Sequence, residues 1–319
     1  PLTNVLPFFK LRYSNGLVGS GSGGRRFGFL TIVTDGAAGY TYGDGVNNRG
    51  YAGVAIQDYG VNVAWSESHK QNLGLEFKTL GSKLSIIVDY FKEHRKGVFL
   101  QRRSLPNYLG LQNYPFGNLG VISNKGFDGT VDLAPFKIGQ TSWTLNGTFS
   151  YNKDNVIEND DPVQPFDYME RRGNNYLANF GYVADGLFQS QEEISNHANQ
   201  SALGQQRVGD IRYRDLNGDG RIDANDITKI GNGDVPNWVY GLSFNVTYRG
   251  FYFGAFFQGT AGAQRALTGD GIIPFNNSNG GERSNLFAAA ADRWTEANPL
   301  ENPLYPRLAF GNSANRNNA

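Results

Sequence analysis

The most constraining feature of this sequence is a repeated alternation of apolar and polar residues with a period of two. In the segment 240–248, Tyr240, Leu242 and Phe244 alternate with small or polar residues. The same pattern recurs in the segments 143–151, 127–133, 84–90, 73–77 and 9–13. Because successive side chains of a β-strand point to opposite faces, each segment predicts a strand with one apolar and one polar face.

The composition agrees with a protein built from strands and turns. Hydrophobic residues make up 39% and charged residues 18% of the 319 residues, and 42 residues are glycine. The formal net charge of zero argues against a nucleic-acid binder, because phosphate backbones require a basic surface. The lack of cysteine excludes a disulfide scaffold and a thiolate metal site. No stretch of about 18 apolar residues occurs, so we expect no transmembrane helix.

The connections between the predicted strands alternate between short and long. We expect seven spanning strands, at 7–18, 61–78, 83–97, 123–135, 142–156, 237–248 and 251–260. Short turns near 80–82, 137–140 and 249–250 alternate with long segments at 19–60, 98–122 and 157–236. This sorting, with aromatic residues at strand ends, is typical of an antiparallel transmembrane β-barrel with long extracellular loops. The alternative is a secreted β-sandwich that binds carbohydrate and holds a structural calcium, because sandwich strands alternate in the same way.

The expected number of strands is too small for a closed barrel. Seven is odd and below the roughly eight strands of the smallest bacterial barrels, and it would leave two open edges in lipid. We therefore expect residues 1–319 to form part of one larger barrel domain, with 157–236 as a long extracellular excursion. Within that excursion, residues 189–200 predict a short helix with Ser190 as its N-cap.

Residues 215–226 match the spacing of a twelve-residue calcium-binding loop of the EF-hand type. Gly220 occupies the position of the sharp turn, and Ile222 is placed to anchor the loop against apolar neighbours. The candidate ligands are Asp215, Asn217, Asp219, Arg221 through its carbonyl, Asp223 and Asp226. The pattern predicts a structural Ca²⁺; the alternative is an Asx-rich turn that satisfies only its own backbone.

The sequence offers no set of catalytic residues. Its three histidines, His69, His94 and His197, form no HxxxH pair and lie near no nucleophile elbow. We therefore expect a protein that is not an enzyme.

The 98–122 segment carries aromatic residues beside amides and arginines, a combination that can stack a sugar ring and bond its hydroxyls. The candidate ligand contacts are Tyr108, Asn113, Tyr114 and Phe116. The alternative is that these aromatics pack the segment onto its neighbours. The polar positions of the strands, such as Ser243, Asn245 and Thr247, have uncharged side chains that can form hydrogen bonds. This favours a neutral imported solute, such as an oligosaccharide, over an ionic one.

A series of motifs in a fixed order spans nearly the whole chain. It comprises NLGLEF at 72–77, NKGF at 124–127, NFGYVADGLFQ at 179–189, GDIRYRD at 209–215, PNWVYGL at 236–242 and YPRL at 305–308. With these motifs the sequence resembles the barrel portion of the SusC-like TonB-dependent outer-membrane transporters of Bacteroidetes.

The resemblance implies active import of a large nutrient across the outer membrane of a Gram-negative cell. It implies a 22-stranded barrel in outer-membrane lipid, a plug domain that contacts TonB, and a SusD-like surface lipoprotein that lids the barrel. The imported ligand would be an oligosaccharide or a peptide. We expect the family's plug domain and its final strands to be absent from residues 1–319.

Overall fold

The computed structural model describes residues 6–21, 26–45, 47–111, 113–267, 271–275 and 286–308. The chain divides into two compact units, which we treat separately. The first comprises Pro1–Val163, Arg171–Tyr176 and Val235–Ala263. The second comprises Gln164–Glu170, Leu177–Asp234 and Gln264–Ala319. The predicted 157–236 excursion therefore contributes most of its residues to the second unit.

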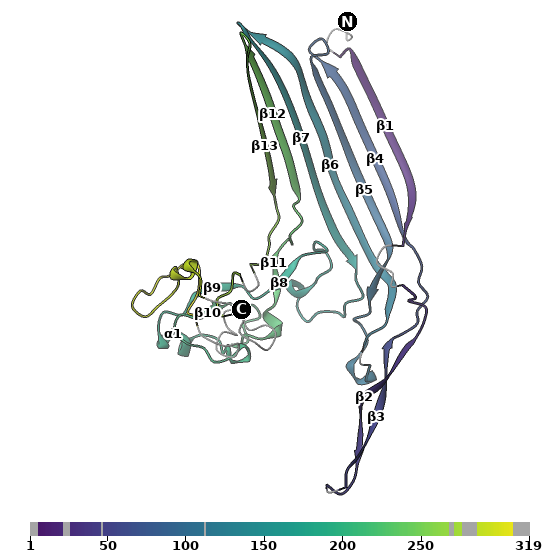
Figure 1. Ribbon diagram of the computed structural model, residues 1–319, viewed down its shortest axis with the longest axis vertical. Helices are drawn as coiled ribbons and strands as arrows, with labels where there is room; N and C mark the ends of the chain where they lie inside the picture. Colours follow the sequence, from purple (N-terminus) through teal and green to yellow (C-terminus); the bar gives the residue numbers. More distant parts are fainter. Residues whose placement is uncertain are drawn as a thin grey trace. The chain divides into compact units, whose positions relative to one another are not determined.

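The first unit contains one antiparallel sheet of seven strands in the order β1-β4-β5-β6-β7-β12-β13 (Figure 1). Its strands are β1 (Phe8–Ser20), β4 (Ser66–Thr79), β5 (Leu84–Gln101), β6 (Phe116–Ile138), β7 (Thr141–Glu158), β12 (Trp238–Tyr248) and β13 (Phe251–Ala261). All seven predicted strands are confirmed. Every neighbouring pair is antiparallel, as the predicted fold class requires, and β1 and β13 form the two edges.

Two predicted connections differ from the structure. Strand β5 continues to Gln101 and β6 begins at Phe116, so the predicted 98–122 loop shrinks to 102–115 and Phe116 is a strand residue. Register shifts around Val98 interrupt the period-two pattern there, which explains the wrong boundaries. The predicted 19–60 connection contains a hairpin, β2 (Ile32–Tyr42) with β3 (Arg49–Asp58), whose three register shifts also obscure the alternation.

The predicted short turns are confirmed, and one of them shows how few residues the connection needs. Strand β12 ends at Tyr248 and β13 begins at Phe251, so only Arg249 and Gly250 lie between them. Both have positive φ, of 45° and 89°. Two successive positive φ values match the right-handed twist of the flanking strands, which is why glycine is favoured in such a turn.

The second unit is built from short elements. Strand β8 (Asn179–Gly181) pairs with β11 (Thr228–Gly231), and β9 (Ala184–Leu187) pairs with β10 (Ile211–Tyr213). The predicted helix is confirmed as α1 (Gln191–Asn196), and the Ser190 Oγ accepts a hydrogen bond from the Glu193 amide at 3.1 Å. Among the described residues, no helix has the length and apolar character needed to cross a membrane.

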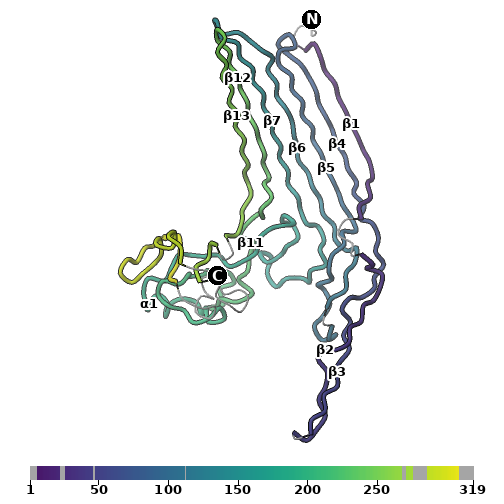
Figure 2. The backbone as a smooth tube through the Cα atoms, in the orientation of Figure 1, coloured from purple at the N-terminus to yellow at the C-terminus, as the bar shows by residue number. Residues whose placement is uncertain are grey.

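Side chains from distant segments form a core in the second unit. Phe188, Ile222 and Trp294 are buried there, and the fully buried Asp210 forms an ion pair of 2.7 Å with Arg307. Residues 286–308, drawn in yellow, therefore return to pack with the 177–234 segment (Figure 2). This unit holds itself together as a water-soluble protein does, through a buried core.

Candidate functional site

The register of the seven-stranded sheet brings most of the apolar residues of its strands onto one face, here called the apolar face. Leu11 pairs with Leu75, and Leu242 pairs with Phe257. Three of these four side chains are exposed: Leu11 by 62%, Leu242 by 43% and Phe257 by 59%. A β-sandwich would bury such residues against a second sheet, so the sandwich alternative is wrong for this sheet.

Aromatic residues mark both ends of the apolar face. One row of paired residues near the long connections, here called the aromatic row, has five aromatic residues and one leucine: Tyr13, Leu73, Tyr90, Phe127, Tyr151 and Trp238. Within this row the rings of Tyr151 and Trp238 lie 4.6 Å apart. Trp143, Tyr248 and Phe251 lie toward the short turns.

The distance between the two aromatic ends matches a membrane. Trp143 and Tyr151 are eight residues apart on β7, and Tyr248 and Trp238 are ten apart on β12. At about 3.4 Å per residue and a tilt of about 40°, these segments span roughly 21–26 Å of bilayer. The apolar band of outer-membrane barrels is about 25 Å tall.

The opposite face of the sheet is polar and contains charge pairs. Arg12 on β1 forms an ion pair of 2.8 Å with Asp89 on β5, reaching across β4. Gly74 on β4 permits this contact, because a Cβ there would lie 2.5 Å from Asp89 and 2.9 Å from Arg12. Asn146 on the same face donates to Asp132 at 2.8 Å. This face is suited to water or polar ligands.

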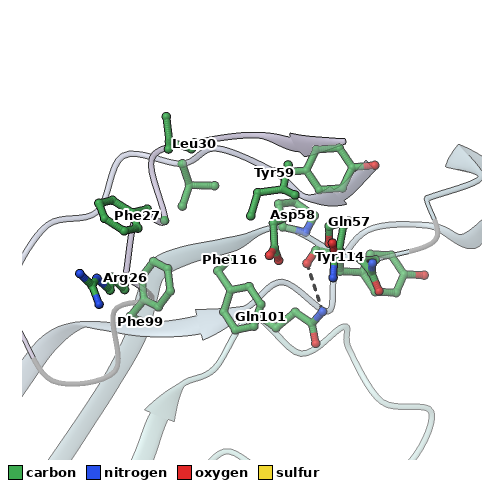
Figure 3. Close-up of a pocket in the computed structure, with 15 residues that line it drawn as sticks. Arg26, Phe27, Leu30, Gln57, Asp58, Tyr59, Phe99, Gln101, Tyr114 and Phe116 are labelled. Carbon is green, nitrogen blue, oxygen red and sulfur yellow. Dashed lines mark hydrogen bonds between the residues drawn. The ribbon is translucent and has the colours of Figure 1, made fainter. Parts of the chain in front are cut away.

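A cavity of about 370 Å³ lies in the first unit, between the base of the β2–β3 hairpin and the ends of β5 and β6 (Figure 3). Aromatic rings line it, with Phe99 and Phe116 stacked at 5.5 Å between ring centroids. Amide groups of Gln57, Gln101 and Asn113 also line it. Its size and its mixture of rings and amides are typical of sites that bind small polar ligands.

Three of the four predicted ligand contacts line this cavity. Asn113 donates to the Gln57 carbonyl at 3.0 Å. The Tyr114 carbonyl accepts from Gln101 at 3.1 Å (Figure 3). Phe116 contributes its ring to the stacked pair. Tyr108 does not line the cavity: it lies on the 3-10 turn Asn107–Leu109 with 86% of its surface exposed.

Several lining residues escaped the sequence reasoning. Arg26, Phe27 and the segment 57–59 come from the connection that we expected to be irregular. The aromatic residues Phe27 and Tyr59 flank the β2–β3 hairpin, so recognition of that hairpin would have placed them together. Phe99 and Gln101 lie on the part of β5 beyond the predicted strand end.

The predicted calcium loop is held closed by its own backbone. The two carboxylate oxygens of Asp215 accept from the Gly218 and Gly220 amides at 2.7 and 2.8 Å. Asp226 is fully buried and accepts from the Leu216 and Asp223 amides at 2.8 and 2.9 Å. The remaining candidates bond within the same turn: Asn217 accepts from the Asp219 amide, Asp219 from the Arg221 amide and Asp223 from the Asn225 amide.

Two observations bear on whether this loop suits a cation. The donor set is hard carboxylate oxygen, and partial burial with the charges of Asp226, Asp215, Asp219 and Asp223 raises the pKa of Tyr168 nearby. However, the described residues include no group of three or more acidic or histidine side chains gathered as a metal site. The loop therefore has oxygen ligands of the kind that Ca²⁺ prefers, but these oxygens accept hydrogen bonds from backbone amides and do not surround a common point.

The chain is similar to curated TonB-dependent receptors of the bacterium Formosa agariphila. It is 26% identical over 291 residues to TonB-dependent receptor P39, a match that covers 80% of this chain and 27% of the relative. It is 25% identical over 252 residues to TonB-dependent receptor P26, covering 75% and 24%. The chain thus spans about a quarter of the length of these relatives. No protein-family model matches the chain.

Solved structures with the same fold come from a peptide transport complex. The chain matches a structure of the RagAB peptide transporter with a TM-score of 0.60 and 17% identity, covering 94% of this chain and 32% of that one. A structure of the RagAB peptide importer in an open-open state gives a TM-score of 0.63 with 16% identity, covering 94% and 31%. At this identity the likeness shows the fold.

Proposed function

We propose that this chain, which belongs to the TonB-dependent receptors, forms part of the barrel and the extracellular vestibule of an outer-membrane importer. The single observation that carries the proposal is the two-faced sheet. Its exposed apolar face is bounded by aromatic residues about one bilayer apart, and its other face is polar. Such a sheet is stable in lipid when further strands of the same protein cover its edges.

The proposed cargo is an oligosaccharide, and the cavity at the β2–β3 hairpin is its proposed contact site. The stacked rings of Phe99 and Phe116 offer a flat apolar surface for a sugar ring. The side-chain amides of Gln57, Gln101 and Asn113 offer donors and acceptors for hydroxyl groups. A peptide is the competing cargo, because the structural relatives are named as peptide transporters.

Ligand binding by the complete transporter tests the cargo and the cavity together. Binding would be measured against an array of neutral oligosaccharides and a library of unmodified peptides of similar mass. We expect binding from the oligosaccharide set, and Phe116→Ala should weaken it about tenfold, the effect of losing about 1.4 kcal/mol of ring contact. Tyr108→Ala is the matched control, since this exposed aromatic lies outside the cavity.

Each outcome of that measurement separates the hypotheses. Binding of peptides alone would replace the oligosaccharide proposal with peptide import. Equal affinities for Phe116→Ala and the unchanged protein would remove the cavity as the contact site. A transporter that binds neither set while remaining inserted in lipid would contradict the proposed cargo and leave the sheet's role unchanged.

The proposed partners follow from the SusC-like resemblance. A SusD-like surface lipoprotein would cover the extracellular side, and TonB would act through a plug region. Co-purification of the complete transporter from outer membranes tests the first partner. Recovery of the transporter without any lipoprotein under mild detergent would contradict it.

We also propose that the 215–226 loop binds a structural Ca²⁺. The support is its donor spacing and the lack of ion pairs between its four carboxylates and Lys or Arg among the described residues. A cation would relieve their mutual repulsion.

Calcium titration of the complete protein should raise the thermal stability of the second unit, and Asp215→Ala with Asp219→Ala should abolish the rise. Glu192→Gln, an acid of helix α1, should not. An unchanged melting profile across the titration would end the calcium proposal.

A further inference from the structure

Three lysines stand side by side on the apolar face of the sheet. Lys92 on β5 pairs with Lys125 on β6, and Lys125 pairs with Lys153 on β7. The pairing is regular here, because the nearest register shifts lie beyond Lys96 and Ile122. All three side chains are exposed. We call Lys92, Lys125 and Lys153 the lysine row.

The lysine row directly follows the aromatic row on the same face. Each lysine lies two residues beyond an aromatic residue, Tyr90 on β5, Phe127 on β6 and Tyr151 on β7. Residues two apart on a strand share a face, and two residues advance about 7 Å. On β5, β6 and β7 the step leads away from the short turns and toward the long connections (Figure 1).

The part of the apolar face within the proposed bilayer span carries no charge. From the aromatic row to the short turns, the described strands place no Lys, Arg, Asp or Glu on this face. The three positive charges are therefore concentrated in the zone next to the aromatic boundary of the proposed bilayer span.

No carboxylate of the described chain neutralises the lysine row. The acids beside it in sequence, Glu93 and Asp154, lie on the polar face because each strand alternates. Glu93 pairs there with Arg95 at 2.9 Å, and Asp154 accepts from the Tyr176 amide. Like charges directly opposite each other on adjacent strands destabilise a sheet. A row of three lysines thus has an unfavourable self-energy that an external anion would relieve.

We propose that the lysine row binds the phosphate groups of lipid headgroups in the leaflet on the long-connection side of the sheet. The inference rests on the proposed function, since it requires the apolar face to contact lipid. Neighbouring strands lie about 4.8 Å apart, so the flexible ammonium groups can converge on one phosphorylated headgroup. Their aliphatic stems lie along the apolar face while the charges reach the headgroup level.

The test uses the complete transporter in bilayers with two lipid probes: phosphorylated lipid A and the same lipid with its phosphates removed. Lipid retained by the protein after detergent washing would be quantified by mass spectrometry. We expect the unchanged transporter to retain the phosphorylated probe at least about tenfold more strongly, because each lysine near an anionic surface contributes roughly a fivefold factor. The Lys92→Gln, Lys125→Gln, Lys153→Gln variant should fall to about twofold or less.

A matched variant removes three lysines from the polar face, Lys10→Gln, Lys78→Gln and Lys137→Gln, and should keep the preference. Equal retention of both probes by an inserted, unchanged transporter would overturn the inference and leave the proposed function standing. Failure of the unchanged transporter to insert at all would overturn both. Loss of the preference on adding inorganic phosphate at millimolar concentration would assign the row to a soluble anion. Loss of the preference only when an acidic protein partner is stripped away would assign it to that partner.

Discussion

The two units of this chain differ in whether their apolar residues are buried within the unit. Among the residues that the structure describes, five of the six buried hydrophobic side chains lie in the second unit, namely Phe188, Tyr213, Ile222, Ala290 and Trp294. The seven-stranded sheet instead leaves large apolar side chains exposed along every strand. The second unit therefore supplies its own hydrophobic interior, while the sheet depends on an apolar environment outside the chain. The second unit packs as a water-soluble fold does, whereas the seven-stranded sheet of the first unit matches the proposed membrane wall.

The largest expected loss of stability is for a substitution of Asp210, which tests whether the second unit is held together by its own core. This carboxylate is fully buried, and Arg307 contacts it at 2.7 Å. Asp210→Ala removes the ion-pair partner of the largely buried Arg307 guanidinium, whose side chain is 16% exposed, and should cost about 3 kcal/mol, the lower end of the range for breaking a buried pair. Hydrogen exchange at the Phe188 amide, which donates to the Asp210 carbonyl, should show a local opening that is easier by that amount. Exchange on β6 should stay the same, and unchanged protection of Phe188 would show that the ion pair does not hold this unit.

A charge on the apolar face probes the dependence of the sheet on lipid. Val131 lies between the aromatic row and the short turns on β6, and its neighbour Thr130 points to the polar face. Val131→Arg should destabilise the bilayer-inserted transporter by about 2–4 kcal/mol, because arginine is costly near the bilayer midplane. Thr130→Arg should cost much less. Denaturant titration in lipid vesicles measures both, and equal costs would mean that the two faces meet the same surroundings.

The smallest expected effect is a loss of stability of the second unit at alkaline pH. Burial raises the pKa of Tyr213 to about 12, and the charges of Tyr182 and Asp210 add to the shift. Because the folded-state pKa exceeds the unfolded value of about 10, this tyrosine's contribution is complete below pH 10 and is lost as pH rises through about 12. Tyr213→Phe should therefore flatten the stability of this unit across that window. A profile identical to that of the unchanged protein would place the alkaline sensitivity elsewhere.

The sheet could be predicted from sequence because one local rule fixes it. Period-two alternation locates a strand from its own residues, and the short turns at 80–82 and 249–250 join neighbouring strands. The rule failed where the register shifts, at the end of β5 and throughout the β2–β3 hairpin. That failure hid half of the cavity lining, including Phe27 and Tyr59.

The core of the second unit was beyond local rules. Trp294 and Arg307 contact residues about a hundred positions earlier, through hydrogen bonds to Gln189 and Asp210. No periodicity links such distant segments. The glycine at position 209 is a trace of this contact in the sequence, but a single glycine does not identify its partner. Gly209 has a φ of 88° and packs so closely against Trp294 that a Cβ there would lie 2.1 Å from the indole.

Spin labels placed along β6 of the complete transporter in bilayers provide the most direct measurement of the claim that the apolar face contacts lipid. The chain has no cysteine, so single cysteines at 127, 128 and 130–133 can be labelled one at a time. Gly129 is left unchanged, because a Cβ there would lie 2.4 Å from the Ile87 carbonyl. Accessibility to oxygen, which concentrates in lipid, should peak at 127, 131 and 133. Accessibility to a water-soluble nickel reagent should peak at 128, 130 and 132. A face at the odd-numbered positions that is shielded from both reagents, as in a sheet packed against protein, would contradict the account.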